Sequence, residues 1–122
     1  MYQAIFYWDE RGEVPVRNLM ESLPDKMRQK IAAWIELLEQ EGPSLRRPYA
    51  DKVQEKLYEL RVRLGSDNIR VLYFFFLKDK IILLHGFRKK DWKIGRNDLN
   101  IAERRMHDFI GRYEEGSVVL EP

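Results

Sequence analysis

Residues 57–89, LYELRVRLGSDNIRVLYFFFLKDKIILLHGFRK, decide the fold, because they contain three apolar runs separated by polar turns. In the first run apolar and polar side chains alternate, which is typical of a strand with one buried face. Residues 65–68 and 78–80 have the composition of turns. The stretch therefore predicts a three-stranded antiparallel meander, with strands at 57–64, 69–77 and 81–89.

The residues before the meander predict one strand and two helices. Residues 2–8, YQAIFYW, are short and aromatic enough to form an N-terminal strand. Pro15 suits the first turn of a short helix that ends near Ser22. Pro24 is expected to open a longer helix, which ends at Gly42 and the proline after it. Together the two helices form a predicted helical hairpin.

The remaining segments complete an α+β fold. Residues 43–56 predict an irregular connection, and a helix with an apolar stripe is expected from about Asn97. The predicted order is an N-terminal strand, a helical hairpin, a three-stranded antiparallel meander and a C-terminal helix. At 122 residues, of which 44% are hydrophobic, the chain is expected to fold as a single domain with one core over residues 1–122.

The composition argues against several classes of site. The chain has no cysteine, so it offers neither a disulfide nor a thiolate metal site, and its two histidines are far apart in sequence. We therefore expect no metal ion and no cofactor. No basic leader followed by an apolar run is visible, and no apolar stretch approaches the ~20 residues of a membrane span. The expected location is cytoplasmic, with no membrane partner.

Positive charge is concentrated in the middle of the chain. The formal net charge is +2, but residues 61–96 contain ten lysines and arginines against three aspartates, which gives this segment +7. The rest of the chain therefore sums to −5. A positive centre in an acidic frame predicts a focused binding site for anions.

Four of these cations are expected to share one face of the meander. If the strands pair across turns of four and two residues, Arg70 lies between Arg63 and Lys89, and Arg61 lies on the same face. Opposed like charges destabilise a sheet, and Glu59 can relieve only part of that repulsion. A phosphate bound among the cations would replace repulsion with charge-assisted hydrogen bonds. The alternative is that each cation extends into water and pairs separately with a carboxylate.

Other side chains near this cluster have more than one interpretation. His85 lies in an apolar strand, so it is expected to be a buried histidine with one hydrogen bond rather than a general base. Trp92 either stacks on a nucleobase or covers the edge of the core. Tyr73 is expected in the core, whereas Arg104 and Arg105 are expected in solvent.

Short motifs along the chain resemble one known family. LYELR at 57–61, IRVLY at 69–73 and LLHGF at 83–87, followed by Lys89 and Lys90, are similar to the pattern of the HigB-like, phage-derived branch of the RelE/ParE toxin superfamily. Pro48, Tyr49 and Lys52 upstream fit that pattern as well, and the likeness covers nearly the whole chain. The resemblance implies a RelE-like α+β fold and the toxin half of a type II toxin–antitoxin pair.

The resemblance also implies an activity and a set of site residues. RelE-like toxins cut mRNA in the ribosomal A site, so a metal-independent endoribonuclease that inhibits translation is expected, with the RNA 2′-hydroxyl as nucleophile. The family's basic active-site positions carry over to Arg61, Arg70, Lys89 and Lys90. The arginines suit phosphate clamps, and either lysine suits proton transfer. Further RNA contacts are expected from Arg46, Arg47, Lys52, Arg63, Arg88, Trp92, Lys93 and Arg96.

The implied partner is a small helix-turn-helix antitoxin of the HigA-like kind. In the HigB-like branch such an antitoxin usually neutralises the toxin and represses the operon, so operator DNA is expected only through the antitoxin. Two other activities stay open. One is a ParE-type toxin that binds DNA gyrase without catalysis, and the other is a decayed toxin that acts as a binding regulator.

One segment departs from the family pattern. After the double lysine, relatives tend to continue Thr-x-Lys-Thr-Pro, whereas residues 91–95 of this chain read DWKIG. Lys93 is kept in register, but both threonines and the proline are absent. The cut-site preference and the efficiency of cleavage therefore stay open.

Overall fold

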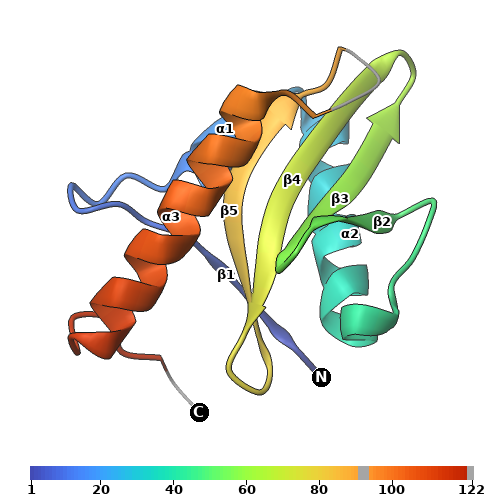
Figure 1. The fold of residues 1–122 in the computed structure, drawn as a ribbon. Coiled ribbons are helices and arrows are strands. Elements are labelled where there is room, and N and C mark those ends of the chain that lie inside the picture. The colour runs from blue at the N-terminus through green and yellow to red at the C-terminus, as the bar shows by residue number, and fades with distance from the viewer. Residues whose placement is uncertain (91–93, 121–122) are drawn as a thin grey trace.

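A five-stranded sheet forms the centre of the molecule and carries helices on both faces (Figure 1). The computed structural model describes residues 1–90 and 94–120. In chain order the elements are β1 (Gln3–Phe6), α1 (Pro15–Glu21), α2 (Asp25–Glu41), a 3₁₀ turn (Gly42–Ser44), β2 (Ala50–Gln54), β3 (Leu57–Leu64), β4 (Asp67–Phe76), β5 (Lys80–Arg88) and α3 (Arg96–Glu114). The strand order is β1-β5-β4-β3-β2, so β1 and β2 form the two edges. Helices α1 and α2 cover one face of the sheet, and α3 lies across the other.

The predicted meander is confirmed, but its register is not the predicted one. Strands β3, β4 and β5 pair antiparallel. Arg61 lies opposite Arg70, at the place where the sequence predicts Arg63. On the other side of β4, Arg70 lies opposite Phe87, where the sequence predicts Lys89. At Arg70 each correction is a shift of two residues, and because side chains alternate with a period of two, the cations keep the predicted face.

The predicted irregular connection over residues 43–56 contains a strand. Ala50–Gln54 forms β2, which pairs antiparallel with β3 and places Asp51 opposite Glu59. The sequence ADKVQ is short and polar, so it shows little of the alternation by which a strand is recognised. The N-terminal strand β1 also joins the sheet, parallel to β5. The sheet therefore has five strands, of which β2 is the one that the sequence does not predict.

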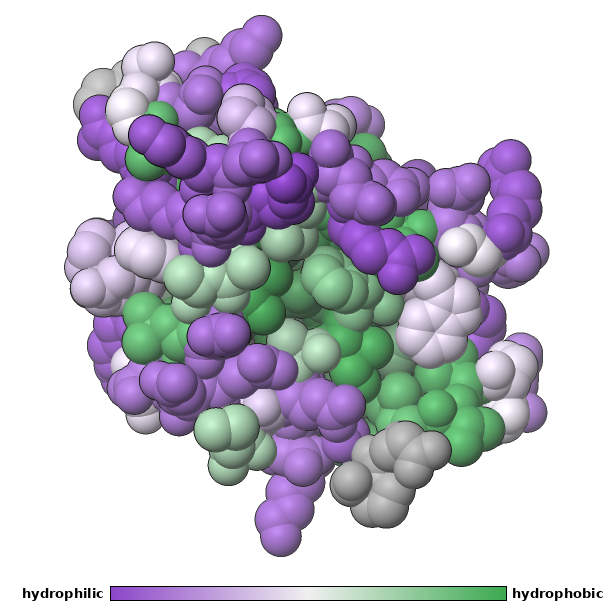
Figure 2. All heavy atoms as spheres, turned by 180° about the vertical axis from the view of Figure 1, so that it is seen from behind, coloured by the Kyte–Doolittle hydropathy of each residue, from purple (hydrophilic) through white to green (hydrophobic). Residues whose placement is uncertain are grey.

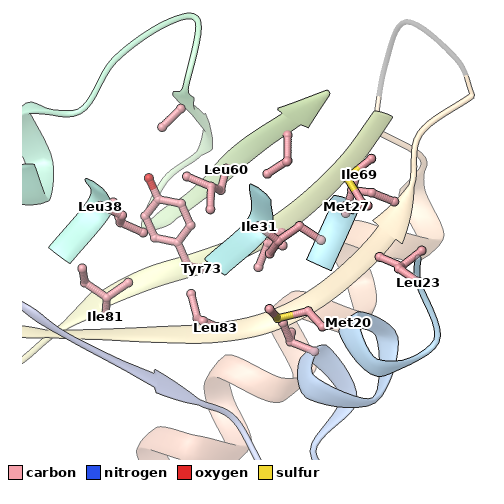
Figure 3. Packing of buried hydrophobic residues seen from close by; sticks show 14 residues of the cluster. Met20, Leu23, Met27, Ile31, Leu38, Leu60, Ile69, Tyr73, Ile81 and Leu83 are labelled. Atoms are coloured by element: carbon pink, nitrogen blue, oxygen red, sulfur yellow. The ribbon is translucent and has the colours of Figure 1, made fainter. Parts of the chain in front are cut away.

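The sheet divides the hydrophobic core into two layers, where the sequence predicts one. Buried side chains of α1 and α2 pack with Tyr73 of β4 on one face, as Figure 3 shows for Ile31 and its neighbours. Seen from that side, polar side chains surround a central apolar area (Figure 2). The other layer joins Leu72 and Phe74 of β4 to Phe109 of α3. Tyr73 is thus a core residue, as predicted, on the face away from α3.

Strand β5 contains a β-bulge that turns one more side chain toward α3. Leu72 lies opposite His85 and Tyr73 lies opposite Leu83, so Leu84 is an extra residue on β5. Leu84 packs in the α3 layer, and His85 contacts α3 as well. Within the described residues, no helix is long and apolar enough to cross a membrane.

Candidate active site

Three of the four predicted catalytic residues line one pocket of about 480 Å³ on the α3 side of the sheet. Arg61 comes from β3, Arg70 from β4, and Lys89 directly follows β5. Pairing between β3 and β4 places the two arginines opposite each other. The fourth residue, Lys90, is exposed and does not line the pocket. Apolar side chains complete the wall: Val53, Ile94 and Leu99.

Glu59 lies between the two arginines and binds both. Arg61 donates from Nε to Oε2 of Glu59 at 3.0 Å, and its Nη2 is 2.9 Å from the same oxygen. Nε of Arg70 is 2.9 Å from Oε1. That contact is out of line for a hydrogen bond, so among the described residues both atoms are buried without a hydrogen-bond partner. Only 7% of the Glu59 side-chain surface is exposed.

A second carboxylate extends this network to the edge of the sheet. Oδ2 of Asp51 is 3.3 Å from Nη2 of Arg61 and 2.7 Å from Nη2 of Arg47. The hydrogen bond from Arg47 is the main reason that the pKa of Asp51 lies below its ordinary value. Three guanidiniums therefore share two carboxylates in the row Arg47, Asp51, Arg61, Glu59 and Arg70.

The two arginines are paired within the cluster, and Glu59 is the carboxylate that they share. Arg61 and Arg70 each contact a carboxylate, because Glu59 faces the same side of β3 as Arg61, two residues along the strand. Burial is the main cause of the lowered pKa of Arg70, and the charge of Glu59 opposes it. A guanidinium nevertheless stays protonated at neutral pH. The pocket thus has three cationic groups, counting Lys89, around one carboxylate.

Lys89 is positioned by its backbone. Its N–H donates to the carbonyl of Asn68 at 2.8 Å, which extends the β4–β5 pairing one residue past the end of β5. The side chain of Lys89 is partly exposed and reaches the pocket that holds Arg61 and Arg70. Two guanidiniums and one ammonium around a solvent-accessible space can bind a phosphate and exchange a proton with its substituents.

The predicted RNA-binding residues fall into separate groups. Arg46, Arg47 and Lys52 line a neighbouring pocket of about 500 Å³ at the β2 edge. Arg63 is exposed and lies two residues beyond Arg61 on β3. Arg96 is exposed at the first residue of α3.

The structure places Arg88 apart from the candidate active site. Arg88 is paired with Ile69, which belongs to the α1/α2 layer, so its side chain faces away from α3. It forms an ion pair with Asp67. Trp92 and Lys93 lie outside the described residues.

A second polar network, which the sequence pattern does not predict, links β5 to α3. Nε2 of His85 is 2.8 Å from Oδ1 of Asp98. Arg105 donates from Nη1 to the carbonyl of Leu84 at 2.9 Å and is 3.3 Å from Nδ1 of His85. Because arginine can only donate, Nδ1 of His85 is the acceptor of the hydrogen bond from Arg105. The ring proton is then on Nε2, which donates a hydrogen bond to Asp98. Burial is the main cause of the lowered pKa of His85.

This network refines one prediction and corrects another. His85 is largely buried, as expected, but it has two side-chain partners rather than one. The prediction that Arg105 is in solvent is wrong: the residue is partly buried, and burial lowers its pKa. The signal was present in the spacing, because Asp98 and Arg105 are seven residues apart on one helix and therefore share a face. Arg104 is exposed, as predicted.

The described residues offer no clear metal site. In residues 1–90 and 94–120, no group of three or more histidine, cysteine, aspartate or glutamate side chains could hold a metal ion.

Two comparisons relate the chain to known proteins. The model of a family described as "Phage derived protein Gp49-like (DUF891)" matches residues 18–107. A protein of Mycobacterium tuberculosis (strain ATCC 25618 / H37Rv) named "Putative toxin HigB3" is 34% identical over 86 residues, which cover 67% of this chain and 75% of that protein. The family match runs from α1 into α3 and includes the β-strand residues of the candidate active site.

Proposed function

Because this chain belongs to the Gp49-like family of phage-derived proteins, as a HigB-like toxin of the RelE/ParE superfamily, we propose that it acts as a ribosome-dependent mRNA endoribonuclease. In this role it is the toxin of a type II toxin–antitoxin system and inhibits translation. The observation that carries the proposal is the convergence of Arg61, Arg70 and Lys89 on one pocket. Ribosomes and mRNA as targets imply that the protein acts in the cytoplasm.

The proposed reaction uses the RNA itself as nucleophile. The 2′-oxygen attacks the adjacent phosphorus, the bond from phosphorus to the 5′-oxygen breaks, and a cyclic 2′,3′-phosphate and a 5′-hydroxyl result. A base takes the proton from the 2′-hydroxyl, and an acid gives one to the leaving 5′-oxygen. Negative charge grows on the phosphoryl oxygens during the attack, so cationic donors aimed at these oxygens lower the barrier.

Arg61 and Arg70 are the proposed phosphate clamps. Glu59 contacts Nε and one terminal nitrogen of Arg61, and it contacts Nε of Arg70. Because Glu59 contacts Nε of Arg70, the terminal nitrogens of Arg70 are the donors assigned to the phosphate in this proposal. Glu59 orients the guanidiniums without using all their donors, since each guanidinium has five N–H groups.

Lys89 is the proposed proton-transfer group. The sequence leaves Lys89 and Lys90 as alternatives, and the position of Lys89 in the wall of the pocket favours it. Lys90 is exposed and outside the pocket, where it can contact RNA. One lysine can serve both steps, because an amine that has taken up the nucleophile's proton is then the acid for the leaving group.

Purified protein and translating ribosomes test the proposal. We expect cuts in phase with codons, mapped by primer extension, and little cutting of the same RNA without ribosomes. Arg70→Ala should abolish the cuts, whereas Arg88→Ala, on the other face of the sheet, should keep them. Equal cutting of free RNA would argue against ribosome dependence. DNA damage signalling after induction in cells, without mRNA loss, would indicate the gyrase-binding alternative.

The proposed partner is a helix-turn-helix antitoxin of the HigA-like kind. The relative from M. tuberculosis is named a toxin, and type II toxins are neutralised by a bound protein. Operator DNA is then contacted through the antitoxin. Co-expression tests this: the product of an adjacent helix-turn-helix gene should co-purify with the chain and restore growth. Growth arrest that persists despite co-expression would reject that product as the antitoxin.

A further inference from the structure

The pocket at the β2 edge combines an apolar floor with a cationic rim. It has a volume of about 500 Å³, and Leu45, Ala50 and Tyr58 supply apolar surface. Arg46 and Lys52 lie on its rim and are both exposed. A space of this size accommodates a small ligand, and the mixture of apolar and cationic groups suits one with a flat apolar part and a negative charge.

Tyr58 offers a rigid aromatic surface in this pocket. Its ring stacks on that of the buried Tyr73, with 5.7 Å between centroids and 19° between planes. An edge contact with Phe75, with 5.2 Å between the ring centroids, further restricts the Tyr58 ring. Since Tyr58 also lines the pocket, part of its surface is available to a ligand. Such a platform can stack on any nucleobase.

Among the described residues, no carboxylate neutralises either of the two rim cations. Within residues 1–90 and 94–120, neither the guanidinium of Arg46 nor the ammonium of Lys52 makes an ion pair. Lys52 lies directly opposite Tyr58 in the β2–β3 pairing, so a positive charge accompanies the aromatic ring. This arrangement differs from that of Arg61 and Arg70, which are both held by Glu59.

Asp51 connects this pocket to the candidate active site. Its Oδ2 contacts Arg47, which lines the edge pocket, and Arg61, which lines the active-site pocket. Only the edge strand β2 separates the two pockets. Asp51 is paired with Glu59 and lies on the same face of the sheet as Glu59, whereas the next residue, Lys52, points to the opposite face. A flexible chain can therefore pass over this edge from one pocket into the other.

We propose that the edge pocket is a subsite for the nucleotide next to the scissile phosphate. The base stacks on Tyr58, and the phosphate of that nucleotide is bound by Arg46 and Lys52. This inference rests on the proposed function, which supplies RNA as the ligand. The ligand class is single-stranded, because a duplex cannot bend around one β-strand while it offers an unstacked base. An acidic protein segment would use the cations but would leave the aromatic platform without a partner.

Binding of a short RNA that cannot be cut tests the subsite. The probe is a fluorescent single-stranded hexanucleotide with 2′-O-methyl groups, which removes the nucleophile, and the readout is fluorescence anisotropy. We expect Arg46→Gln, Lys52→Gln and Tyr58→Leu each to weaken binding about tenfold, the size of a lost stacking or charge contact. Lys78→Gln, an exposed lysine in the β4–β5 turn, is the matched control and should bind like the unmodified protein.

The outcomes separate the subsite from the nuclease. Unchanged affinity in Arg46→Gln and Lys52→Gln overturns the subsite, and these two variants decide the matter even if Tyr58→Leu does not fold. A glutamate-rich peptide that displaces the RNA, and whose own binding is lost in Tyr58→Leu, also overturns it in favour of a protein ligand. Because the probe is not cleaved, loss of binding in the variants supports the subsite even if the protein never cuts mRNA, which would refute the proposed function alone.

On ribosomes the same variants give a second readout. Arg46→Gln and Lys52→Gln should raise KM for mRNA cleavage or change the base preferred beside the cut, with kcat nearly unchanged. Arg70→Ala should remove cleavage itself. A protein that cuts with the same KM and the same flanking preference in all subsite variants would refute the subsite and leave the nuclease in place.

Discussion

Glu59 restrains the two arginines on which the proposed reaction depends. A carboxylate with only 7% of its side chain exposed is costly to keep charged unless cations compensate it. Arg61 and Arg70 provide that compensation, and in return their guanidiniums are held in place. The same carboxylate lowers the net positive charge of the pocket. Glu59 therefore improves the positioning of a bound phosphate but lowers the affinity of the pocket for that phosphate.

This role predicts opposite effects of Glu59→Gln on binding and on cleavage. The uncharged amide cannot hold two guanidiniums, so the rate of cleavage on ribosomes should fall about tenfold to a hundredfold. The loss of a negative charge should tighten binding of the uncleavable RNA. Single-turnover kinetics and anisotropy measure the two quantities, and Glu36→Gln, an exposed residue on α2, is the control. Equal rates in both variants would show that Glu59 is not a positioning residue.

His85 predicts a loss of stability in mild acid. Its pKa lies below the ordinary value of 6.5 in the folded protein, because burial and Arg105 oppose protonation more than Asp98 favours it. The unfolded chain therefore takes up a proton at a higher pH than the folded chain does. Stability is full above about pH 6.5 and falls as the pH drops toward the lowered pKa, by at most about 1.4 kcal/mol per pH unit.

His85→Gln removes this titration and keeps a donor for Asp98. We expect the free energy of unfolding to fall less between pH 7.5 and pH 5.5 in the variant than in the unmodified protein, as measured by urea denaturation at both values. Carboxylates titrate in both proteins, so the difference isolates His85. The same pH dependence in both proteins would mean that His85 titrates alike in the folded and unfolded states.

Gly42 ends α2 in a conformation that other residues cannot adopt without strain. Its φ is +54°, and a Cβ there would lie 2.3 Å from the ring of Tyr2. Gly42→Ala should therefore lower the free energy of unfolding by about 2 kcal/mol. Gly111→Ala, inside α3 with no atom within 4 Å of the added Cβ, should instead raise it by about 0.5–1 kcal/mol. Urea denaturation measures both, and a neutral Gly42→Ala would contradict the argument.

Local sequence signals predicted the helices and the central strands well. The prolines and Gly42 mark the ends of α1 and α2 to within one or two residues, because these residues restrict the backbone wherever they occur. Alternation over residues 57–64 predicted the buried face of β3. Strand β2 was missed because it is stabilised by pairing with β3 at the sheet edge rather than by an apolar face of its own.

The candidate site was predictable only in part. The alternation of side chains along each strand was enough to place Arg61, Arg70 and Lys89 together. A register error of two residues leaves every side chain on the same face of the sheet. The carboxylate partners were not predictable in the same way. Asp51 reaches Arg61 only because β2 joins the sheet. The contacts of His85 depend on the β-bulge in β5, and a bulge leaves no clear signal in a single apolar run.

At the scale of the whole molecule, the distribution of charge matters more than its sum. The net charge is only +2, yet residues 61–96 carry +7, and Arg46 and Lys52 extend the positive surface along the β2 edge. Attraction of a polyanion is set by the groups near its path, because charges beyond a Debye length of about 8–10 Å are screened at physiological salt. The molecule should therefore bind RNA in an oriented way despite its small net charge.

Salt dependence makes this prediction quantitative. Two or three phosphates bound in the two pockets should give a plot of log K against log salt concentration with a slope of about −1.5 to −2, since each phosphate on single-stranded RNA contributes roughly −0.7. Anisotropy titrations of the uncleavable hexanucleotide over a series of KCl concentrations measure the slope. Arg46→Gln should reduce its size by about 0.7, whereas Lys78→Gln should leave it unchanged. A slope near zero, or equal losses in both variants, would mean that RNA is not held by localised phosphate contacts at these pockets.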